Sequence, residues 1–173
     1  GFNTPAVPNE YAWGNTTLVP VSAILNDGAA DEIVNTPATA NANVTNSLPG
    51  NRPVRTGLFA RSSGSDRTVS GATYYGVMNM SDNIFETVVS MVNAQGKAVD
   101  ASVHGDGNLG GDGRTDIAAW QAFQAFGARG SAFNGSLLVA RTSDRGNANL
   151  FAGSFGADTN QPNLGIRLAR TAP

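Results

Sequence analysis

The chain has 173 residues and a net charge of −2, and only 14% of its residues are charged. This charged share is well below the roughly 25% that is usual for soluble domains, and the small negative charge gives no basic surface for nucleic acid. Cysteine is absent and histidine occurs once, so disulfides, thiolate catalysis, cysteine metal sites and sites with two imidazoles from one chain are excluded.

The first residues, GFNTPAVPNE, contain neither the basic region nor the apolar region of a signal peptide, and they do not begin with Met. A processed or truncated chain is therefore expected. No apolar run approaches the ~20 residues of a membrane span. The low charge and the abundance of Gly, Asn, Ala, Ser and Thr are typical of secreted or surface proteins, and they predict an extracellular or cell-surface location.

In chain order, Tyr11 and Trp13 alternate in strand fashion before a Gly-Asn turn. Residues 26–56 are rich in Asn, Ala, Thr and Pro and have no sustained period, which predicts a long loop. Such a loop is unusual in a compact domain unless it is functional or tied down. Residues 54–60 are expected to form a short strand, and a polar loop follows them.

Residues 74–89, YYGVMNMSDNIFETVV, begin like a strand and then enter a turn rich in oxygen ligands. The turn carries five such side chains: Asn79, Ser81, Asp82, Asn83 and Glu86. One interpretation is a tight connection, because Asn, Asp and Ser side chains cap and turn the backbone. The other is a bound hard cation, which requires several oxygens from one short loop. Spacing alone leaves both open and favours the turn.

Residues 83–95 are strongly apolar and predict a buried strand followed by a turn. A second acidic loop then places four oxygen ligands close together, at Asp106, Asn108, Asp112 and Asp116. It lacks the twelfth-position Glu and the flanking helices of an EF-hand. A Gly-rich surface loop is the favoured interpretation and a second cation loop is the alternative, with His104 as a hydrogen-bonding residue at its edge.

Beyond this loop, Trp120 and Phe123 are expected to belong to a satellite core, although the tryptophan could also stack on a sugar. Asp144 is expected to form a surface ion pair with Arg141 and Arg145. No repeat or linker divides the chain. The sequence predicts one loop-rich α+β domain over residues 1–173.

Five segments carry a resemblance to a known family: AWGN (12–15), YYGVMNMSDNIFE (74–86), RGSAF (129–133), RTSDRG (141–146) and GIRLAR (165–170). In this order they resemble the formylglycine-generating-enzyme, or sulfatase-modifying-factor, family, which has a C-type-lectin-like fold. That family shows a Trp-Gly-Asn turn and a core motif Gly-Leu-x-Asp-Met-x-Gly-Asn-x-Trp-Glu. It continues with Arg-Gly-Gly-Ser-Trp, an arginine-rich segment and a closing Gly-Phe-Arg. The match spans nearly the whole chain, so the resemblance implies the same fold.

The chain departs from the family pattern at several positions. Asp82, Phe85 and Ile166 stand where the family has Gly, Trp and Phe, and Arg-Gly-Gly-Ser-Trp is reduced to RGSAF. Oxidase members of the family use a pair of cysteines near that segment to bind copper and activate oxygen, and the iron-dependent relatives need several histidines. This chain has no cysteine and one histidine. The resemblance therefore implies a catalytically degenerate member that is not an enzyme.

The resemblance also bears on the turn at residues 79–86. Carried over residue by residue, the family's calcium ligands fall on the Asn79 side chain, the backbone of Asp82 with its side chain as a further donor, the Ile84 backbone and the Glu86 side chain. The resemblance thus favours calcium as a structural cofactor, over the simple turn that spacing alone favours.

In the family, further strands and two helices precede the Trp-Gly-Asn turn. The resemblance therefore implies that residues 1–173 are the C-terminal portion of one such domain, with the N-terminal helical part missing. A fold without those helices would expose a large apolar face. We expect that face to be covered by a companion fragment or by neighbouring copies of the chain.

The function expected from these observations is that of a non-catalytic surface binding or structural module, stabilised by calcium. It could be a subunit of an extracellular assembly or filament, and its partners would be other copies or a companion fragment, with a glycan or protein as ligand. The alternative is a degenerate or split oxidase whose active residues lie outside this chain.

Overall fold

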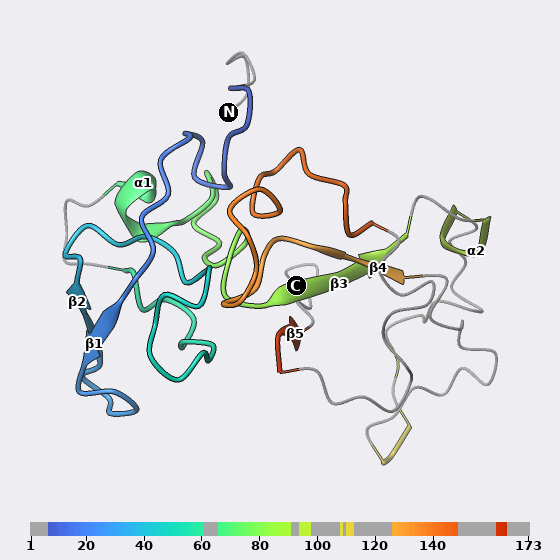
Figure 1. Cartoon of the computed structure of the whole chain (residues 1–173). Helices are drawn as coiled ribbons and strands as arrows, with labels where there is room; N and C mark the ends of the chain where they lie inside the picture. Colours follow the sequence, from blue (N-terminus) through green and yellow to red (C-terminus); the bar gives the residue numbers. More distant parts are fainter. Residues whose placement is uncertain are drawn as a thin grey trace. The chain divides into compact units, whose positions relative to one another are not determined.

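The computed structural model of the chain describes residues 7–60, 66–90, 94–97, 108, 110–112, 126–148 and 162–165. Its elements run in the order β1 (Ala23–Leu25), β2 (Ile33–Thr36), α1 (Arg67–Ser70), β3 (Phe85–Val89), α2 (Ala94–Lys97), β4 (Phe126–Arg129) and β5 (Leu164–Gly165) (Figure 1). Short strands and two single-turn helices make this part of the chain a mixed α+β structure, as predicted. No helix in these ranges has the length and apolar character needed to cross a membrane.

Two compact units divide the chain. The first consists of Gly1–Glu86, Arg129–Arg145 and Gln161–Pro173, and the second of Thr87–Ala128 and Gly146–Asn160. The boundary falls inside β3, directly after Glu86. The oxygen-rich turn at residues 79–86 therefore lies wholly within the first unit, which also contains most of the described residues.

The described residues form two small sheets. β1 and β2 pair antiparallel, with Ile24 opposite Val34 and an irregularity next to Ala23. β2 lies within residues 26–56, so the prediction of a continuous loop there is wrong at Ile33–Thr36, where β-branched residues favour a strand. The second sheet has the order β4-β3-β5, and β3 confirms the strand expected within residues 83–95.

Three expected strand segments are turns instead. The chain turns at Tyr11–Trp13 and within residues 54–60. Before the oxygen-rich loop, the Thr73 N–H donates to Val77 O at 2.8 Å and closes a tight turn around Gly76, whose φ is +79°. A glycine at positive φ interrupts strand geometry, and this outweighs the β-propensity of the two tyrosines beside it.

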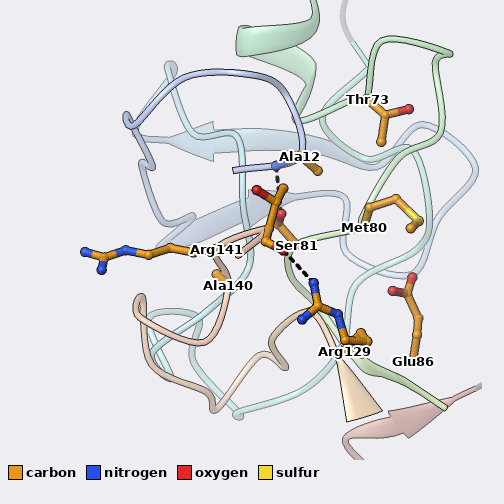
Figure 2. Close-up of a pocket in the computed structure, with 10 residues that line it drawn as sticks. Ala12, Thr73, Met80, Ser81, Glu86, Arg129, Ala140 and Arg141 are labelled. Carbon is orange, nitrogen blue, oxygen red and sulfur yellow. Dashed lines mark hydrogen bonds between the residues drawn. The ribbon is translucent and has the colours of Figure 1, made fainter. Parts of the chain in front are cut away.

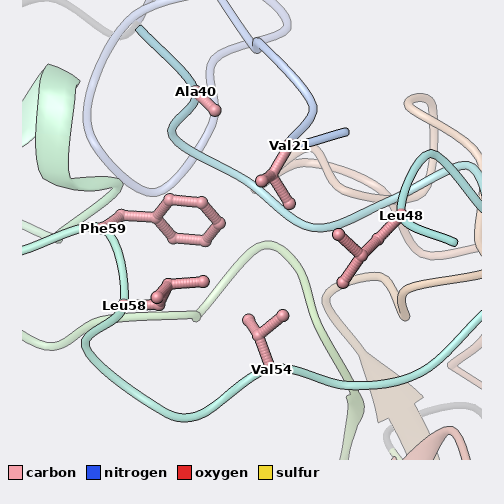
Figure 3. Packing of buried hydrophobic residues seen from close by; sticks show 6 residues of the cluster. All are labelled: Val21, Ala40, Leu48, Val54, Leu58 and Phe59. Atoms are coloured by element: carbon pink, nitrogen blue, oxygen red, sulfur yellow. The ribbon is translucent and has the colours of Figure 1, made fainter. Parts of the chain in front are cut away.

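The larger apolar cluster is built mainly from loop residues (Figure 3). Its buried members are Val21, Ala40, Leu48, Val54, Leu58 and Phe59. Ile24 of β1 and Val34 of β2 pack against it from the two-stranded sheet. The long loop predicted from composition is therefore tied down by its own apolar residues, which lie far apart in the sequence.

A second cluster surrounds Trp13, whose side chain is fully buried. The indole stacks on Tyr11, with ring centroids 5.1 Å apart, and its Nε1–H donates to Asn15 Oδ1 and to Thr17 O at 2.9 Å each. A buried Trp needs a partner for its N–H. The Trp-Gly-Asn sequence supplies this partner locally, two residues further along the chain.

Buried asparagines connect the loops to one another. Asn83 Oδ1 accepts from the Val54 N–H at 2.8 Å and from Asn43 Nδ2 at 3.2 Å, while Asn83 Nδ2 donates to Val54 O at 2.9 Å. Asn41 Oδ1 similarly accepts from the Val19 N–H, and its Nδ2 donates to Thr68 O of α1 at 2.8 Å. These side chains satisfy backbone groups that neither sheet reaches.

Asparagine also suits the backbone geometry of these loops. Seven non-glycine residues among those described have positive φ: Asn9, Asn26, Thr45, Asn46, Asn51, Asn79 and Asn83. Six of the seven are Asn, the residue that tolerates the left-handed region best after glycine. The Asn-rich composition thus follows from two needs of a loop-built fold, which are left-handed turns and side-chain partners for buried backbone.

The single turn of α1 is capped at both ends. Asp66 Oδ1 accepts from the Thr68 and Val69 N–H groups, and the hydroxyl of Thr68, the largest influence, helps to hold the pKa of Asp66 below its ordinary value. Gly71 ends the helix at φ +66°, and a Cβ there would lie 2.4 Å from Asn41 O. Only glycine fits this position, where α1 meets the Asn41 loop.

Replacing Asn83 with Ala tests the role of the buried asparagines. Asn83→Ala removes three side-chain hydrogen bonds from a buried site and places Ala at φ +77°. We expect the free energy of unfolding, measured by urea denaturation, to fall by about 3 kcal/mol.

The control is Asn51→Ala, because Asn51 also has positive φ but is exposed. This variant should lose less than about 1 kcal/mol. Equal losses in the two variants would mean that backbone strain, and not the side-chain hydrogen bonds, accounts for the effect.

Candidate functional site

The oxygen-rich loop that leads into β3 is buried in the first unit. Asp82 is 1% exposed, and Asn79 and Glu86 are 5% and 6% exposed. Ser81 and Asn83 are buried as well. An ordinary surface turn would leave such side chains in water, so the loop is part of the interior. Buried carboxylates require hydrogen bonds, a counter-charge or a metal to compensate their lost hydration.

Asp82 is held by neutral donors. Its Oδ2 accepts from the Asn43 N–H at 2.7 Å, and Asn79 Nδ2 lies 3.2 Å from each carboxylate oxygen. Hydrogen bonds to an ionised acceptor are stronger than neutral ones. The carboxylate therefore joins residues 41–43 to the turn at Asn79. The structure thus brings together two of the predicted metal ligands, Asn79 and Asp82.

The Asn79 amide can serve either a hydrogen bond or a cation. Its Oδ1 faces the Gly57 N–H at 3.4 Å, and its Nδ2 faces Asp82. The two amide ends have nearly the same shape, so turning the amide over exchanges Oδ1 and Nδ2 with little change in packing. A cation between Asn79 and Asp82 requires that rotation, because an amide nitrogen does not ligate calcium.

Glu86 and the Met80 carbonyl face the same point beside Gly130. A Cβ added to Gly130 would lie 3.0 Å from Met80 O and 3.5 Å from Glu86 Oε2, and the φ of this glycine is +74°. The glycine of the RGSAF segment thus lets two oxygens of the loop approach its backbone closely. The segment is further attached by the Ser131 N–H, which donates to Ser81 O at 3.2 Å.

Ile84, the remaining predicted ligand, follows a tight turn. Its N–H donates to Asp82 O at 3.0 Å around Asn83, and the atom Cδ1 of its side chain lies close to Gly165 of β5. Across the described ranges, no group of three or more His, Asp or Glu residues could hold a metal ion. The predicted set contains only two carboxylates, so this observation does not decide the calcium prediction.

The second predicted cation loop cannot be assembled from the described residues. Asp106 and Asp116 lie outside them, and only Asn108 and Asp112 of the set are described. His104, Trp120 and Phe123 also lie outside the described residues. The sequence prediction for this loop therefore stays a prediction.

A pocket of about 230 Å³ lies beside Glu86 in the first unit (Figure 2). Charged, hydroxyl and small apolar groups line it: Ala12, Thr73, Met80, Ser81, Glu86, Arg129, Gly130, Ala140, Arg141 and Thr142. Its three hydroxyls are already engaged, because Ser81 Oγ accepts from the Ala12 N–H, Thr73 Oγ1 accepts from the Val77 N–H and Thr142 Oγ1 donates to Glu10 O. Its chemistry is therefore set mainly by the charged groups.

Arg129 is fixed by main-chain acceptors. Its Nη2 donates to Thr142 O at 2.6 Å and its Nη1 to Asp144 O. Arg145 Nη1 donates to the same two carbonyls, at 3.0 and 2.9 Å. Burial lowers the pKa of the Arg129 guanidinium and the charge of Arg145 lowers it further, whereas Asp144 raises it. Arg129 nevertheless stays protonated, because a guanidinium group is not deprotonated in proteins.

Two features of this region differ from the prediction or lie beyond it. The sequence predicts an ion pair of Asp144 with Arg141 and Arg145, whereas in the structure Arg129 and Arg145 donate to the Asp144 main-chain carbonyl. The sequence also predicts no role for Asn43, which contacts both Asp82 and Asn83. Local spacing carries no signal for Asn43, because about forty residues separate it from its partners.

Comparison with protein-family models, with curated proteins and with solved structures gives no match for this chain. The resemblance to the formylglycine-generating-enzyme family consequently stays a prediction from the quoted motifs. The geometry of the loop and its pocket is the remaining guide to function.

Gly130→Ala tests the close approach of the loop oxygens. A methyl group there would meet Met80 O and Glu86 Oε2 and would also strain the backbone. We expect the free energy of unfolding to fall by about 2 kcal/mol or more, measured by urea denaturation.

Gly28→Ala is the matched control, since Gly28 has φ +78° but no atom lies within 4 Å of an added Cβ. It should lose only the cost of backbone strain, about 1 kcal/mol. If Gly28→Ala is as destabilising as Gly130→Ala, the oxygens do not confine the Gly130 position.

Proposed function

We propose that the chain is a non-catalytic binding or structural module of the cell surface or extracellular space, stabilised by one calcium ion in the Asn79–Glu86 loop. The observation that carries this proposal is the burial of two carboxylates, Asp82 and Glu86, with the Asn79 amide on one eight-residue loop. This is the loop where the family resemblance places a calcium ion. The C-type-lectin-like fold belongs to the same proposal.

The donor set suits a hard cation. Calcium accepts carboxylate, amide and main-chain carbonyl oxygens in flexible geometry, at about 2.3–2.6 Å. The loop offers the Glu86 carboxylate, the Asn79 amide after rotation, and the carbonyls of Asp82 and Ile84, with the Asp82 carboxylate adjacent. A bound cation would offset the cost of burying negative charge, and it would hold together a first unit whose described residues contain little regular secondary structure.

The chemistry of the chain also supports a non-catalytic role. Without cysteine, the RGSAF region offers no thiolate for the copper site of the family's oxidases, and one histidine cannot supply the iron site of its other enzymes. A scaffold of loops fixed by buried side chains suits recognition or assembly, where loop surfaces make the contacts. Tyr74 and Tyr75, which are 66% and 88% exposed on their turn, provide aromatic surface for such contacts.

Calcium removal tests the proposal directly. A ligand that binds only the folded chain stabilises it by about 2.7 kcal/mol at one hundred times its Kd. We expect the melting temperature of the wild-type chain to rise on calcium addition and to fall on chelation. Glu86→Gln should be less stable in calcium and largely insensitive to chelator.

Glu32→Gln is the control for losing a buried carboxylate. Glu32 is 5% exposed, and Arg55 Nε lies 3.5 Å from its Oε2, away from the calcium loop. This variant should lose stability but keep the full response to calcium. A wild-type melting temperature that does not respond to calcium or chelator would show that the loop is only a turn.

The non-catalytic part of the proposal has its own test. The copper-supplemented chain should not convert the cysteine of a sulfatase peptide to formylglycine, as followed by mass spectrometry, because it has no thiolate to bind copper. An active formylglycine-generating oxidase serves as the positive control. Formylglycine formed by this chain alone would refute the proposal.

A further inference from the structure

The chain contains four copies of a pattern that accepts sugar on asparagine. The pattern is Asn-x-Ser/Thr with any residue except Pro in the middle, and it is the acceptor of N-linked glycans in exported proteins. In an asparagine-rich chain it also arises by chance, so the pattern alone selects none of the four. The four asparagines are Asn15, Asn43, Asn79 and Asn134. Because transfer requires an accessible side-chain amide, the structure distinguishes among them.

Two of the four asparagines are buried and already use the acceptor nitrogen. Asn43 is 1% exposed, and its Nδ2 donates to Arg52 O at 3.0 Å and to Asn83 Oδ1 at 3.2 Å. Asn79 is 5% exposed, and its Nδ2 faces the Asp82 carboxylate. A bulky, hydrated sugar on either nitrogen would require the surrounding loops to open. The folded chain therefore excludes these two positions.

Asn15 is half-buried and has a structural role. Its Oδ1 accepts from the Trp13 Nε1–H and from the Thr17 N–H at 2.9 Å each, which fixes the side chain beside the buried indole. Asn15 also lines a recess of about 220 Å³ together with Asn41 and Thr68. An oligosaccharide attached there would meet the walls of this recess. Asn15 is therefore a poor acceptor in the folded chain.

Asn134 lies on an exposed turn whose backbone is held in place. The Gly135 N–H donates to Ala132 O at 2.8 Å, and Gly135 O accepts from the Thr45 N–H at 3.0 Å. Ala132 is buried, whereas Asn134 and Ser136 are exposed. The turn is therefore anchored through its buried side, and the two side chains that the pattern requires are accessible to solvent.

The Asn134 side chain leaves its nitrogen available. Its Oδ1 accepts from Asn163 Nδ2 at 3.2 Å at the surface, and its own Nδ2 makes no hydrogen bond within the described part of the chain. N-linked transfer modifies Nδ2 and keeps the amide oxygen, so the contact with Asn163 can remain. The Ser136 hydroxyl, which completes the pattern, likewise has no hydrogen bond to any residue that the structure describes.

We propose that Asn134 is an acceptor site for an N-linked glycan. The proposal rests on the cell-surface or extracellular location proposed above, because this modification is made on exported chains, and it adds the residue that is modified. The sugar donor is an oligosaccharide linked to a lipid through diphosphate. Asn134 Nδ2 forms a bond to the anomeric carbon of the first sugar while the bond from that carbon to the diphosphate oxygen breaks. The lipid diphosphate leaves with the electron pair, and one amide proton passes to a base of the transferase.

Transfer to the folded full chain tests the proposal. The chain is incubated with an oligosaccharyltransferase that recognises Asn-x-Ser/Thr and with lipid-diphosphate-linked N,N′-diacetylchitobiose, and glycopeptide mass spectrometry locates the sugar. We expect one glycan, on Asn134, with the other three patterns unmodified. Short synthetic peptides that span each of the four patterns should all be accepted, since nothing buries their amides. This difference between chain and peptides assigns the selection to the structure.

Substitutions at the turn separate modification from folding. Ser136→Ala removes the exposed hydroxyl of the pattern and should abolish transfer to Asn134, while the melting temperature stays that of the wild type. Ser136→Thr keeps a hydroxyl and should still be modified. Thr16→Ala is the matched control, because it removes an exposed hydroxyl from the middle position of the Asn15 pattern, where the residue type does not matter. It should leave transfer at Asn134 unchanged.

The chain isolated from its natural source should carry sugar on the same peptide. The proposal is overturned if the folded chain accepts no sugar, if the sugar maps to another asparagine, or if the natural chain is unmodified at Asn134. Its failure is distinct from failure of the proposed function. A chain that calcium stabilises but that carries no sugar at Asn134 refutes only the modification. A chain that carries the sugar but does not respond to calcium refutes the calcium module and keeps the modification.

Discussion

The requirement to satisfy buried backbone polar groups shapes the first unit. Its larger core is made mostly of loop residues, and a loop in the interior has N–H and C=O groups that no strand ladder satisfies. Asparagine amides supply the missing partners, and Asn83 pairs with both polar groups of Val54 much as a neighbouring strand would. The loop backbone can be buried beside the apolar clusters because these amides satisfy its N–H and C=O groups.

The same constraint links the scaffold to the candidate site. Asn43 donates its N–H to Asp82 and its amide to Asn83, so the loop that carries the predicted calcium ligands is held by the bonds that hold the core. Gly130 then brings a distant segment against Met80 and Glu86, and Arg129 joins the 142–144 carbonyls to it. The residues that hold the core therefore also hold the candidate site, and a substitution that weakens one is expected to disturb the other.

The sequence allowed part of this to be predicted. The α+β class, the strand at Phe85–Val89 and the clustering of oxygen ligands at 79–86 follow from apolar runs and local spacing. The turn at Tyr74–Val77 was not predicted, because the β-propensity of its tyrosines and valine favours a strand. The positive φ of Gly76 instead gives the backbone a turn conformation. Asn43 acts through partners about forty residues away and leaves no pattern in a single sequence. Arg129 belongs to the quoted RGSAF segment, but its contacts go to main-chain carbonyls, which no side-chain pattern reveals.

Reliance on amides has a consequence for how the protein ages. Asparagine is among the heat-sensitive residues that proteins of hot environments contain less often. Hydrolysis of the Asn83 amide would replace the Nδ2 donor with an oxygen facing Val54 O, so two acceptors would oppose each other in the interior. The change would turn the Asn83–Val54 hydrogen bond into a repulsive contact, although the side chain keeps nearly the same shape. Chemical lifetime, as much as folding equilibrium, therefore limits a scaffold built in this way.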